Sequence, residues 1–503
     1  MTERGPQITL SGGGLRKYPA KLHAQNAASH LGVSEGLIFL HGQHRLYIED
    51  SDMFYHFRQR RYFYYLSGVN EEDCYLTYDI ERHHSTLYIP PITVEGVVWF
   101  GKGPTIKEAE ERYDFDEVML TSSMPDEIEY WLRMNPHKKV YILRESQSLR
   151  QIIHSPLEPN YDMTSLMPAL DASRVIKDHD ELVAIKRAIR ISSIGHRTIM
   201  HHITSLKTEA EVHALYLDVC IAHGSQVQSY PPIIASGANA SSLHYFDAND
   251  TLKGKSLLCM DAGAEWECYS SDITRTFPLT AKGWPSKETA EIYALVEEMQ
   301  ERCIAMLGPG VRYLDAFILA DWIAIEGLMR MGIFRKTDVE EVLNSGATKA
   351  FFPHGLGHHM GLDVHDVSAK PILSMTQSDN SSTRGISLDS MADMRLKLAP
   401  CTSDAALLEP GMVITVEPGI YFNHYALTKL YLPNPQISKY IDQEKLQRYM
   451  HVGGVRIEDD ILITKDGYEN LTMTPKGKEM LEIIRDGAKC KHSEKCRLGL
   501  DSQ

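Results

Sequence analysis

Residues 354–366 read HGLGHHMGLDVHD, so four histidines and two aspartates fall within thirteen positions. Glycine is disfavoured inside helices, and the three glycines of this run predict an irregular segment whose backbone can approach another group closely. Imidazole side chains can bind a metal or exchange a proton near neutral pH. The run is also compatible with a surface loop that is merely rich in histidine, so its interpretation depends on carboxylates elsewhere in the chain.

Two aspartates lie in a predicted hairpin. Residues 255–277 read KSLLCMDAGAEWECYSSDITRTF, which indicates two strands around a turn. We place the turn centre between Trp266 and Glu267. Asp261 then faces Asp272, and facing residues of an antiparallel pair have Cβ atoms roughly 4.5–5.5 Å apart. Two carboxylates at that distance repel each other unless a cation lies between them. Two solvated aspartates would not explain why Asp261 ends an apolar run, so the pattern favours a metal site.

Two further apolar strands carry a glutamate. Residues 412–421 read MVITVEPGIY and contain Glu417, and residues 452–464 read VGGVRIEDDILIT and contain Glu458. One buried carboxylate could pair with Arg456, but several on different core strands, beside a histidine run, favour a metal centre. Four carboxylates and one imidazole suit Mn²⁺ or Co²⁺ better than a structural Zn²⁺, which would draw on cysteine. Bridging carboxylates could hold two ions about 3.5–4 Å apart and generate a hydroxide at neutral pH.

The composition is that of a globular protein, with 43% hydrophobic and 24% charged residues. A formal net charge of −15 argues against a nucleic-acid binder, which would show a basic face. Residues 1–30 lack an apolar signal-peptide core, and no apolar run is long enough for a membrane helix. Eight cysteines without a C-x-x-C pair argue against a zinc knuckle or a disulfide framework. We therefore expect a reduced, cytoplasmic protein that binds neither nucleic acid nor membrane.

The length predicts more than one domain, because 503 residues exceed one ordinary hydrophobic core. Short strands between helices predict a mixed α/β domain over residues 36–170, with strands at 37–40, 74–78 and 85–90 and helices at 107–113 and 125–133. Asp178 begins a capping box with Glu181, which predicts a long helix at the start of a second domain. The remaining boundaries are a flexible lead-in over 1–35, a linker over 171–177, a second domain over 178–485 with an insertion at 366–408, and a tail over 486–503.

The order of the candidate residues resembles that of the aminopeptidase P/prolidase family of pita-bread metallopeptidases. The likeness covers residues 178–485 and rests on four strings, which are SDITR at 271–275, HGLGH at 354–358, EPG at 417–419 and GGVRIEDD at 453–460. Residues 36–170 look like the amino-terminal domain of that family. The resemblance implies an α/β protein of two domains, in which a mixed α/β domain precedes a pita-bread catalytic domain.

The resemblance also implies a site for two Mn²⁺ ions, with Co²⁺ as an alternative. Asp261 would bind one ion. Asp272 and Glu458 would bridge both ions, and His358 and Glu417 would complete the second.

Four further side chains receive roles from the same resemblance. His244 would stabilise the developing oxyanion. His354 and His365 would flank the substrate, with His365 near the scissile carbonyl. Arg456 would orient the metal-binding carboxylates.

The implied reaction is hydrolysis of the bond between an N-terminal residue and a penultimate proline, so proline-containing peptides are the expected partners. A hydroxide held between the metals would attack the carbonyl carbon. Glu417 would take its proton and pass it to the proline nitrogen. The free amino terminus of the substrate would dock at Asp261 and its metal. A homodimer is compatible with the resemblance.

Two other functions stay open at this point. In the prolidase subgroup, which is restricted to dipeptides, an arginine-rich run precedes the strand of the first metal glutamate, whereas residues 402–407 here read TSDAAL. Arg384 and Arg395 in the insertion could substitute, and residues 421–450 and 75–101 resemble the eukaryotic prolidase-like subgroup. The missing arginine nevertheless favours an aminopeptidase that accepts longer peptides. A metal-free binding protein of the same fold is the alternative of another class, and the five filled ligand positions argue against it.

Overall fold

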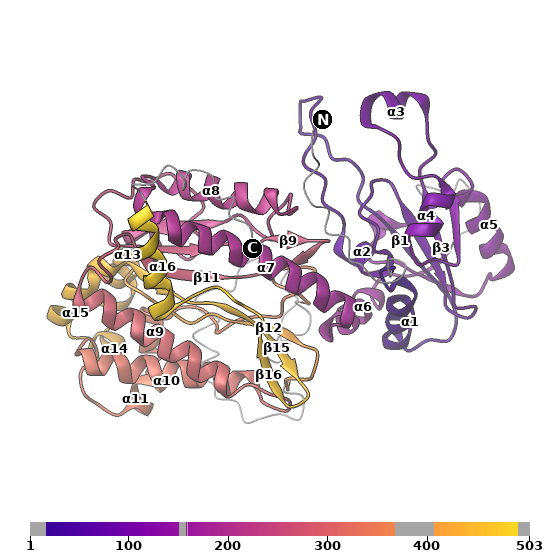
Figure 1. Ribbon diagram of the computed structural model, residues 1–503. Coiled ribbons are helices and arrows are strands. Elements are labelled where there is room, and N and C mark those ends of the chain that lie inside the picture. Colours follow the sequence, from indigo (N-terminus) through magenta and orange to yellow (C-terminus); the bar gives the residue numbers. More distant parts are fainter. Residues whose placement is uncertain (1–16, 150–156, 158, 368–406, 491–503) are drawn as a thin grey trace. The chain divides into compact units, whose positions relative to one another are not determined.

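The structure is a computed structural model that describes residues 17–149, 157, 159–367 and 407–490. Two compact units divide the chain at Ser173, namely Met1–Ser173 and Arg174–Gln503. Each unit has its own sheets and helices (Figure 1). Most of the predicted insertion at 366–408 and of the predicted tail at 486–503 lies outside the described residues.

A six-stranded mixed sheet forms the centre of the first unit, in the order β4-β3-β2-β1-β5-β6. The pairs β1–β2 and β2–β3 are antiparallel, and the other three pairs are parallel. The strands are β1 Leu37–His41, β2 Tyr75–Asp79, β3 His84–Ile89, β4 Glu117–Leu120, β5 Lys139–Tyr141 and β6 Asn160–Asp162. The three strands predicted from the sequence are confirmed to within one residue.

Helices accompany this sheet, and both predicted helices are present as α4 and α5. The helices are α1 Ala20–Leu31, α2 Arg61–Ser67, α3 Val94–Phe100, α4 Ile106–Arg112, α5 Met124–Met134 and α6 Leu166–Val175. Two predicted boundaries need correction. Helix α1 occupies residues 20–31 of the expected flexible lead-in, and its buried face is mostly alanine, which gives a weak hydrophobic period. Helix α6 continues into the expected linker, so most of that linker is helical.

Several small sheets form the second unit. Strands β7 Ile233–Ser236, β8 Leu257–Asp261 and β11 Thr274–Pro278 pair in the order β11-β8-β7, and β12 Val413–Val416, β15 Asp459–Thr464 and β16 Gly467–Asn470 pair in the order β12-β15-β16. Two antiparallel two-stranded pairs complete the set, β9 Glu265–Trp266 with β10 Tyr269–Ser270 and β13 Gly419–Tyr421 with β14 Gly454–Arg456. An isolated antiparallel bridge between Thr274 and Glu458 joins two of these sheets at one point.

Long helices pack on the strands of the second unit. Helix α7 His179–His202 lies against α8 Glu209–Ala222 and α16 Gly477–Cys490, and α9 Lys287–Ala305 lies against α10 Tyr313–Met331 (Figure 1). The predicted capping box at the start of α7 is confirmed, because the Asp178 side chain accepts a hydrogen bond from the Glu181 amide at 2.9 Å and the Glu181 side chain accepts one from the Asp178 amide at 2.9 Å. Shorter helices are α11 Val339–Ser345, α13 His424–Ala426, α14 Pro435–Ser438 and α15 Gln443–Tyr449.

Within the described ranges, no helix combines the length and the apolarity that a bilayer crossing requires.

The turn of the hairpin lies one residue further along the chain than predicted, so the strand register differs by two residues. Asp261 lies opposite Thr274 and not opposite Asp272. The turn residues are Glu267 and Cys268, with φ values of 48° and 63°. Two consecutive residues at positive φ form the kind of two-residue turn that matches the twist of a hairpin. Such a turn usually contains glycine or asparagine, so this sequence gives no local sign of where the turn lies. Asp261 and Thr274 face each other and so point to the same side of the hairpin. Side chains alternate along a strand, so Asp272, two positions before Thr274, points to that side as well.

Candidate metal centre

The carboxylates of the site lie where strands end or break. Asp261 is the last residue of β8, and Asp272 lies in the irregular stretch between β10 and β11. Glu458 lies in the break between β14 and β15, where its amide donates a hydrogen bond of 3.0 Å to the Thr274 carbonyl. Strand ends from separate sheets therefore meet at one place. This arrangement explains why carboxylates on apolar strands can be close to one another.

The histidine run of residues 354–366 lies beside β12. The Thr415 amide donates to the His358 carbonyl at 2.9 Å, and the His358 amide donates to Thr415 Oγ1 at 3.0 Å. A Cβ atom on Gly357 would lie 2.2 Å from the Thr415 carbonyl oxygen, so this close approach requires glycine. The pairing holds His358 next to the strand that leads into Glu417.

Four of the five predicted metal ligands converge. His358 Nε2 lies 3.5 Å from Asp272 Oδ2 and 3.4 Å from Glu417 Oε1. One ligand atom each from Asp272, His358 and Glu458 lie within 4.8 Å of one another. Three carboxylates and one imidazole therefore face a common space.

Asp261 joins this group through two neighbours. The Tyr230 hydroxyl lies 2.5 Å from Asp261 Oδ1 and 2.5 Å from Asp272 Oδ1. A phenol has one proton, so Tyr230 donates to one of these carboxylates at a time. Arg456 Nη2 donates to Asp261 Oδ2 at 2.7 Å, and both residues are buried. Arg456 and Tyr230 thus both contact Asp261, and the role of Arg456 in orienting metal-binding carboxylates stays a prediction.

The buried carboxylates of the site repel one another, and this repulsion shifts their pKa values. Burial, together with the negative charge of Asp261, raises the pKa of Asp272. Burial and the neighbouring carboxylates raise the pKa of Glu417 to about 7 and that of Glu458 well above its usual range. Burial lowers the pKa of His358, but the hydrogen bond to Asp272 and the charge of Glu417 outweigh it and raise this pKa to about 9. Without a cation, the cluster would therefore hold protons that carboxylates at the surface have lost.

The residues present fit a divalent metal pair. The Thr274 hydroxyl donates to Glu458 Oε2 at 2.6 Å, whereas Glu458 Oε1 is buried and has no hydrogen-bond partner among the described residues. A buried carboxylate oxygen without a partner is costly in a folded protein. A cation bound between carboxylates removes that cost and the mutual repulsion. The donor set of carboxylate oxygens and one imidazole nitrogen is typical of hard or borderline divalent ions.

A buried ion pair locks two of the quoted strings together. Arg275 Nη2 donates to Asp459 Oδ1 at 2.7 Å, and both side chains are only 1% exposed. Arg275 Nη1 also donates to the Glu458 carbonyl at 2.8 Å. Asp460 Oδ2 accepts a hydrogen bond of 3.1 Å from the Asp272 amide. These contacts hold the backbone at Glu458 and just after it against the segment that carries Asp272.

His354 is connected to Arg456 through a tyrosine. Arg456 Nη1 lies 2.9 Å from the Tyr421 hydroxyl, and that hydroxyl lies 2.8 Å from His354 Nε2. Since arginine only donates, Tyr421 accepts from Arg456 and donates to His354. His354 Nδ1 then donates to the Gly355 carbonyl at 2.8 Å. His354 Nδ1 lies 4.0 Å from Glu417 Oε2, so this histidine lies beside the predicted general base.

His365 and His244 lie on the open side of the cluster. The His365 ring lies edge-on to the His358 ring, with centroids 4.4 Å apart. Desolvation within the site, together with the charges of His358 and His244, lowers the pKa of His365 to about 4, although its outer edge is exposed. His244 is exposed and stacks on Phe246 with centroids 5.9 Å apart. The roles of both histidines toward a substrate stay predictions.

Sequence reasoning did not identify three of the side chains that shape this site. Tyr230 touches two carboxylates but lies in a loop with no recognisable pattern. Tyr421 was part of a quoted strand without a role, and Thr274 was part of a quoted string without one. Thr274 follows Asp272 by two positions, and this period of two is the signal that could have placed its side chain near the cluster.

Family models match both units. Residues 183–465 match the model of metallopeptidase family M24, and residues 21–141 match the aminopeptidase P N-terminal domain. The first match alone covers more than half of the chain.

Individual proteins agree with these models. A probable Xaa-Pro aminopeptidase of Aspergillus clavatus is 49% identical over 482 residues, which is 95% of each chain. A probable Xaa-Pro aminopeptidase of Aspergillus niger is 48% identical over 491 residues, which is 96% of each chain. Among solved structures, the low-pH form of Escherichia coli aminopeptidase P has a TM-score of 0.75 at 26% identity and covers 94% of this chain and all of its own. A variant of that protein in complex with substrate has a TM-score of 0.74 at 26% identity, with the same coverage.

The second unit and its carboxylate–histidine cluster define a hydrolase of the metallopeptidase class with the pita-bread fold. The chain belongs to metallopeptidase family M24, in its aminopeptidase P group. The expectation of a two-domain α/β protein with a pita-bread catalytic domain is confirmed, and so is the resemblance to this family. Dependence on a divalent metal follows from the family and from the cluster around Asp272, His358 and Glu458.

Proposed function

We propose that this protein is a manganese-dependent Xaa-Pro aminopeptidase, which removes the N-terminal residue from peptides whose second residue is proline. The observation that carries the proposal is the convergence of Asp272, His358, Glu417 and Glu458, with one buried oxygen of Glu458 left for a cation. The relatives named as probable Xaa-Pro aminopeptidases support the substrate class.

The ligand roles follow the contacts of each side chain. Asp272 and Glu458 would be shared between two ions, as the family resemblance implies, and their ligand atoms lie within 4.8 Å of each other. His358 and Glu417 would hold one ion and Asp261 the other, with Arg456 keeping Asp261 in place. The ions, when bound, would supply a nucleophilic hydroxide at neutral pH and polarise the scissile carbonyl.

The remaining steps belong to side chains of this protein. Glu417 would take the proton released by the attacking water and deliver it to the proline nitrogen as the peptide bond breaks. His354, which lies beside Glu417 and is fixed by Tyr421, would keep that carboxylate oriented. His365 and His244, on the open side, would donate hydrogen bonds to the carbonyl oxygen of the substrate.

The test compares paired substrates on protein freed of metal with a chelator and then loaded with Mn²⁺, Co²⁺, Zn²⁺ or Mg²⁺. We expect cleavage of a tripeptide Xaa-Pro-Xaa in the Mn²⁺ form, little cleavage of the matched Xaa-Ala-Xaa, and none in the chelated form. Turnover of Xaa-Pro dipeptides alone would instead identify a prolidase. Equal cleavage of the proline and alanine peptides would contradict the proposed specificity.

Two expectations of the sequence analysis stay predictions beside this proposal. A cytoplasmic location is one, and fractionation of cells that express the tagged protein would check it. A homodimer is the other, and light scattering on the purified protein would check it.

A further inference from the structure

His244 is carried by a long connection between two strands. Residues 237–256 join β7 to β8, and the stretch around His244 and Phe246 is exposed. The first part of the connection is fixed by close backbone packing, because a Cβ atom on Gly454 would lie 2.2 Å from the Ala240 carbonyl oxygen. Asn423 Nδ2 also donates to the Ser241 carbonyl at 3.1 Å. These contacts end before His244, so another part of the protein must order the residues that follow.

That part is a single buried carboxylate on the neighbouring helix. Glu209 is the first residue of α8 and has no exposed surface. Its two oxygens accept five hydrogen bonds, and every donor lies in the segment from β7 to the end of the His244 connection. The donors are the Ser236 amide at 2.8 Å, the Ser236 hydroxyl at 2.7 Å, Asn239 Nδ2 at 3.1 Å, the Tyr245 hydroxyl at 2.9 Å and the Asp250 amide at 2.9 Å.

The two oxygens of Glu209 hold opposite ends of the connection. Oε1 accepts from Ser236 and Asn239, which precede His244. Oε2 accepts from Tyr245, which directly follows His244, and from the Asp250 amide. The same carboxylate therefore closes the segment into a loop with His244 at its exposed part.

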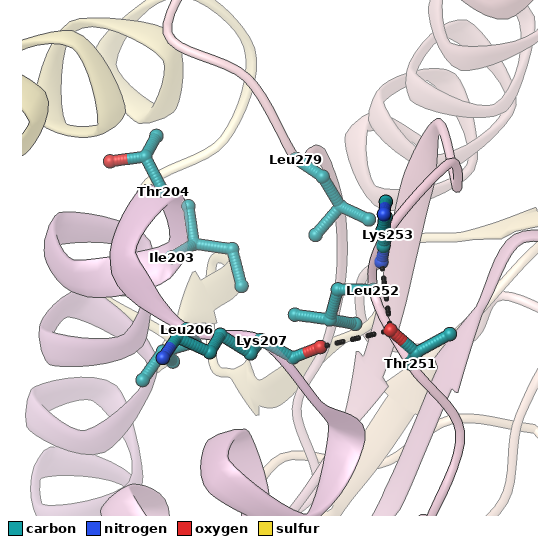
Figure 2. A pocket seen from close by; sticks show the side chains of 8 residues that line it. All are labelled: Ile203, Thr204, Leu206, Lys207, Thr251, Leu252, Lys253 and Leu279. Carbon is teal, nitrogen blue, oxygen red and sulfur yellow. Dashed lines mark hydrogen bonds between the residues drawn. The ribbon is translucent and has the colours of Figure 1, made fainter.

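Backbone hydrogen bonds also join the end of this loop, residues 250–252, which we call its foot, to the start of α8. The Glu209 amide donates to the Asp250 carbonyl at 2.9 Å, and the Leu252 amide donates to the Lys207 carbonyl at 2.8 Å. Figure 2 shows this foot, where Thr251 lies against Lys207 at the edge of a cavity of about 440 Å³. The cavity is lined by side chains of both segments, and Leu252 at this point belongs to the buried core of the second unit.

We propose that Glu209 is a positioning residue, whose carboxylate orders the loop so that His244 faces His365 on the open side of the metal cluster. This inference rests on the proposed function, because it assigns Glu209 to the reaction through His244. Glu209 itself lies inside the protein and contacts neither the cluster nor the space in front of it.

The charge state and shape of the carboxylate matter, because all five donors point toward it. A glutamine has one oxygen and one amide nitrogen. If its oxygen faces Ser236 and Asn239, its nitrogen faces the Asp250 amide, which is also a donor. Glu209→Gln therefore breaks the second half of the clamp while keeping side-chain volume. Tyr245→Phe removes one of the five bonds and is a milder variant. Asp218→Asn, on the exposed side of the same helix, is the matched acid-to-amide control.

The first measurement is amide hydrogen exchange on the metal-free protein, which does not depend on activity. In Glu209→Gln we expect the amides of residues 243–250 to exchange roughly tenfold faster or more, as loss of a hydrogen bond to a charged group suggests. The effect should be smaller in Tyr245→Phe and absent in Asp218→Asn. Unchanged exchange over 243–250 in Glu209→Gln would overturn the proposal, and Tyr245→Phe supplies the same comparison if the glutamine variant does not fold.

The second measurement is a double-mutant cycle on the metal-loaded enzyme. We expect Glu209→Gln to lower kcat roughly 10–100-fold with metal content unchanged. A displacement of a catalytic group such as His244 by about 1 Å is enough to lower the rate by up to about 100-fold. In a His244→Ala background the same substitution should have little further effect, because Glu209 acts through His244. An equal loss in both backgrounds would assign Glu209 a merely structural role. A wild-type protein that cleaves no Xaa-Pro peptide would refute the proposed function, while the exchange result would still decide whether Glu209 orders the loop.

Discussion

Thr274 donates a hydrogen bond of 2.6 Å to one carboxylate oxygen of Glu458 and leaves the other oxygen without a partner among the described residues. The two residues also pair through their main chains, with 3.0 Å between the Glu458 amide and the Thr274 carbonyl. The hydroxyl therefore sets which oxygen of Glu458 faces the cluster. Partners of this kind tune metal affinity without touching the ion.

Thr274→Val should weaken metal binding while the fold persists. Valine has nearly the same shape but cannot donate a hydrogen bond, so Glu458 would lose its fixed orientation. We expect the affinity for Mn²⁺ to fall roughly 10–100-fold, as is common for such partners. Titration calorimetry on the chelated protein measures this directly. Thr198→Val in α7, whose hydroxyl bonds only within its own helix, is the matched control. An unchanged affinity in Thr274→Val would show that Thr274 does not support a metal ligand.

Asp272→Asn should abolish binding of both ions. Asp272 lies within reach of His358 and Tyr230 and shares the cluster with Glu458. A neutral amide offers one weak oxygen donor and cannot replace a carboxylate shared by two cations. After loading and gel filtration, elemental analysis should find about two Mn²⁺ per wild-type chain by the two-metal arrangement, and close to none in the variant. Retention of both ions by Asp272→Asn would place the shared ligand elsewhere.

His365→Ala should leave the metals in place and slow the reaction. The ring of His365 lies against the His358 ring but on the open side of the cluster. Loss of one hydrogen bond to the developing oxyanion lowers turnover by roughly 10²–10³-fold. We expect kcat to fall by that factor with metal content unchanged. If the variant came out of gel filtration without metal, His365 would be a metal ligand and not a substrate contact.

Asp366→Asn should destabilise the second unit strongly. Asp366 accepts hydrogen bonds from Lys177 at 2.8 Å and from Arg174, and all three side chains are at most 2% exposed. Removing the anion leaves the buried Lys177 without a carboxylate among the described residues, while Arg174 keeps its contact with the half-exposed Asp363. Breaking such a buried pair costs about 3–5 kcal/mol. Urea unfolding measures the loss. Glu469→Gln, which breaks the half-exposed pair with Lys186, is the control and should cost less than about 1 kcal/mol.

The contribution of Asp366 should also depend on pH. Burial raises the pKa of this carboxyl, but the charges of Arg174 and Lys177 outweigh it and lower the pKa to about 2, from an ordinary value of 3.8. A lowered pKa in the folded state stabilises the protein above the unfolded-state pKa, and that stability is lost as pH falls toward the folded-state pKa. The gap in unfolding free energy between wild type and Asp366→Asn should therefore be constant from pH 7 to about 5 and narrow below about pH 4. A gap that widens on acidification would contradict the assigned partners.

The sequence identified the side chains that converge in the cluster better than it identified the groups around them. Asp261, Glu417 and Glu458 were recognisable because a carboxylate on an apolar strand needs a cation, and this argument depends on composition along one strand. Tyr230 could not be found in that way, because its contacts with Asp261 and Asp272 join a loop to strands far away in the sequence.

The hairpin turn and the linker also differ from the prediction, because no local sequence pattern marks the features that determine them. The hairpin turn was predicted one residue before its observed position, since Glu267 and Cys268 adopt positive φ without the glycine or asparagine that usually marks such a turn. The expected linker instead supplies Arg174 and Lys177, whose partner Asp366 lies about 190 positions away. An ion pair over that separation leaves no local pattern that could predict it.

Thr274 and Glu458 are 184 positions apart, and their pairing brings the last metal ligand to the first ones. During synthesis, a nascent chain would contain Asp261, Asp272 and His358 long before the ribosome reached Glu458. Such a fragment would carry repelling carboxylates with no completed cage, so tight ion capture would coincide with the arrival of the final strands. Metal uptake would thus depend on the strands that flank Glu458 having been made and having folded against Thr274.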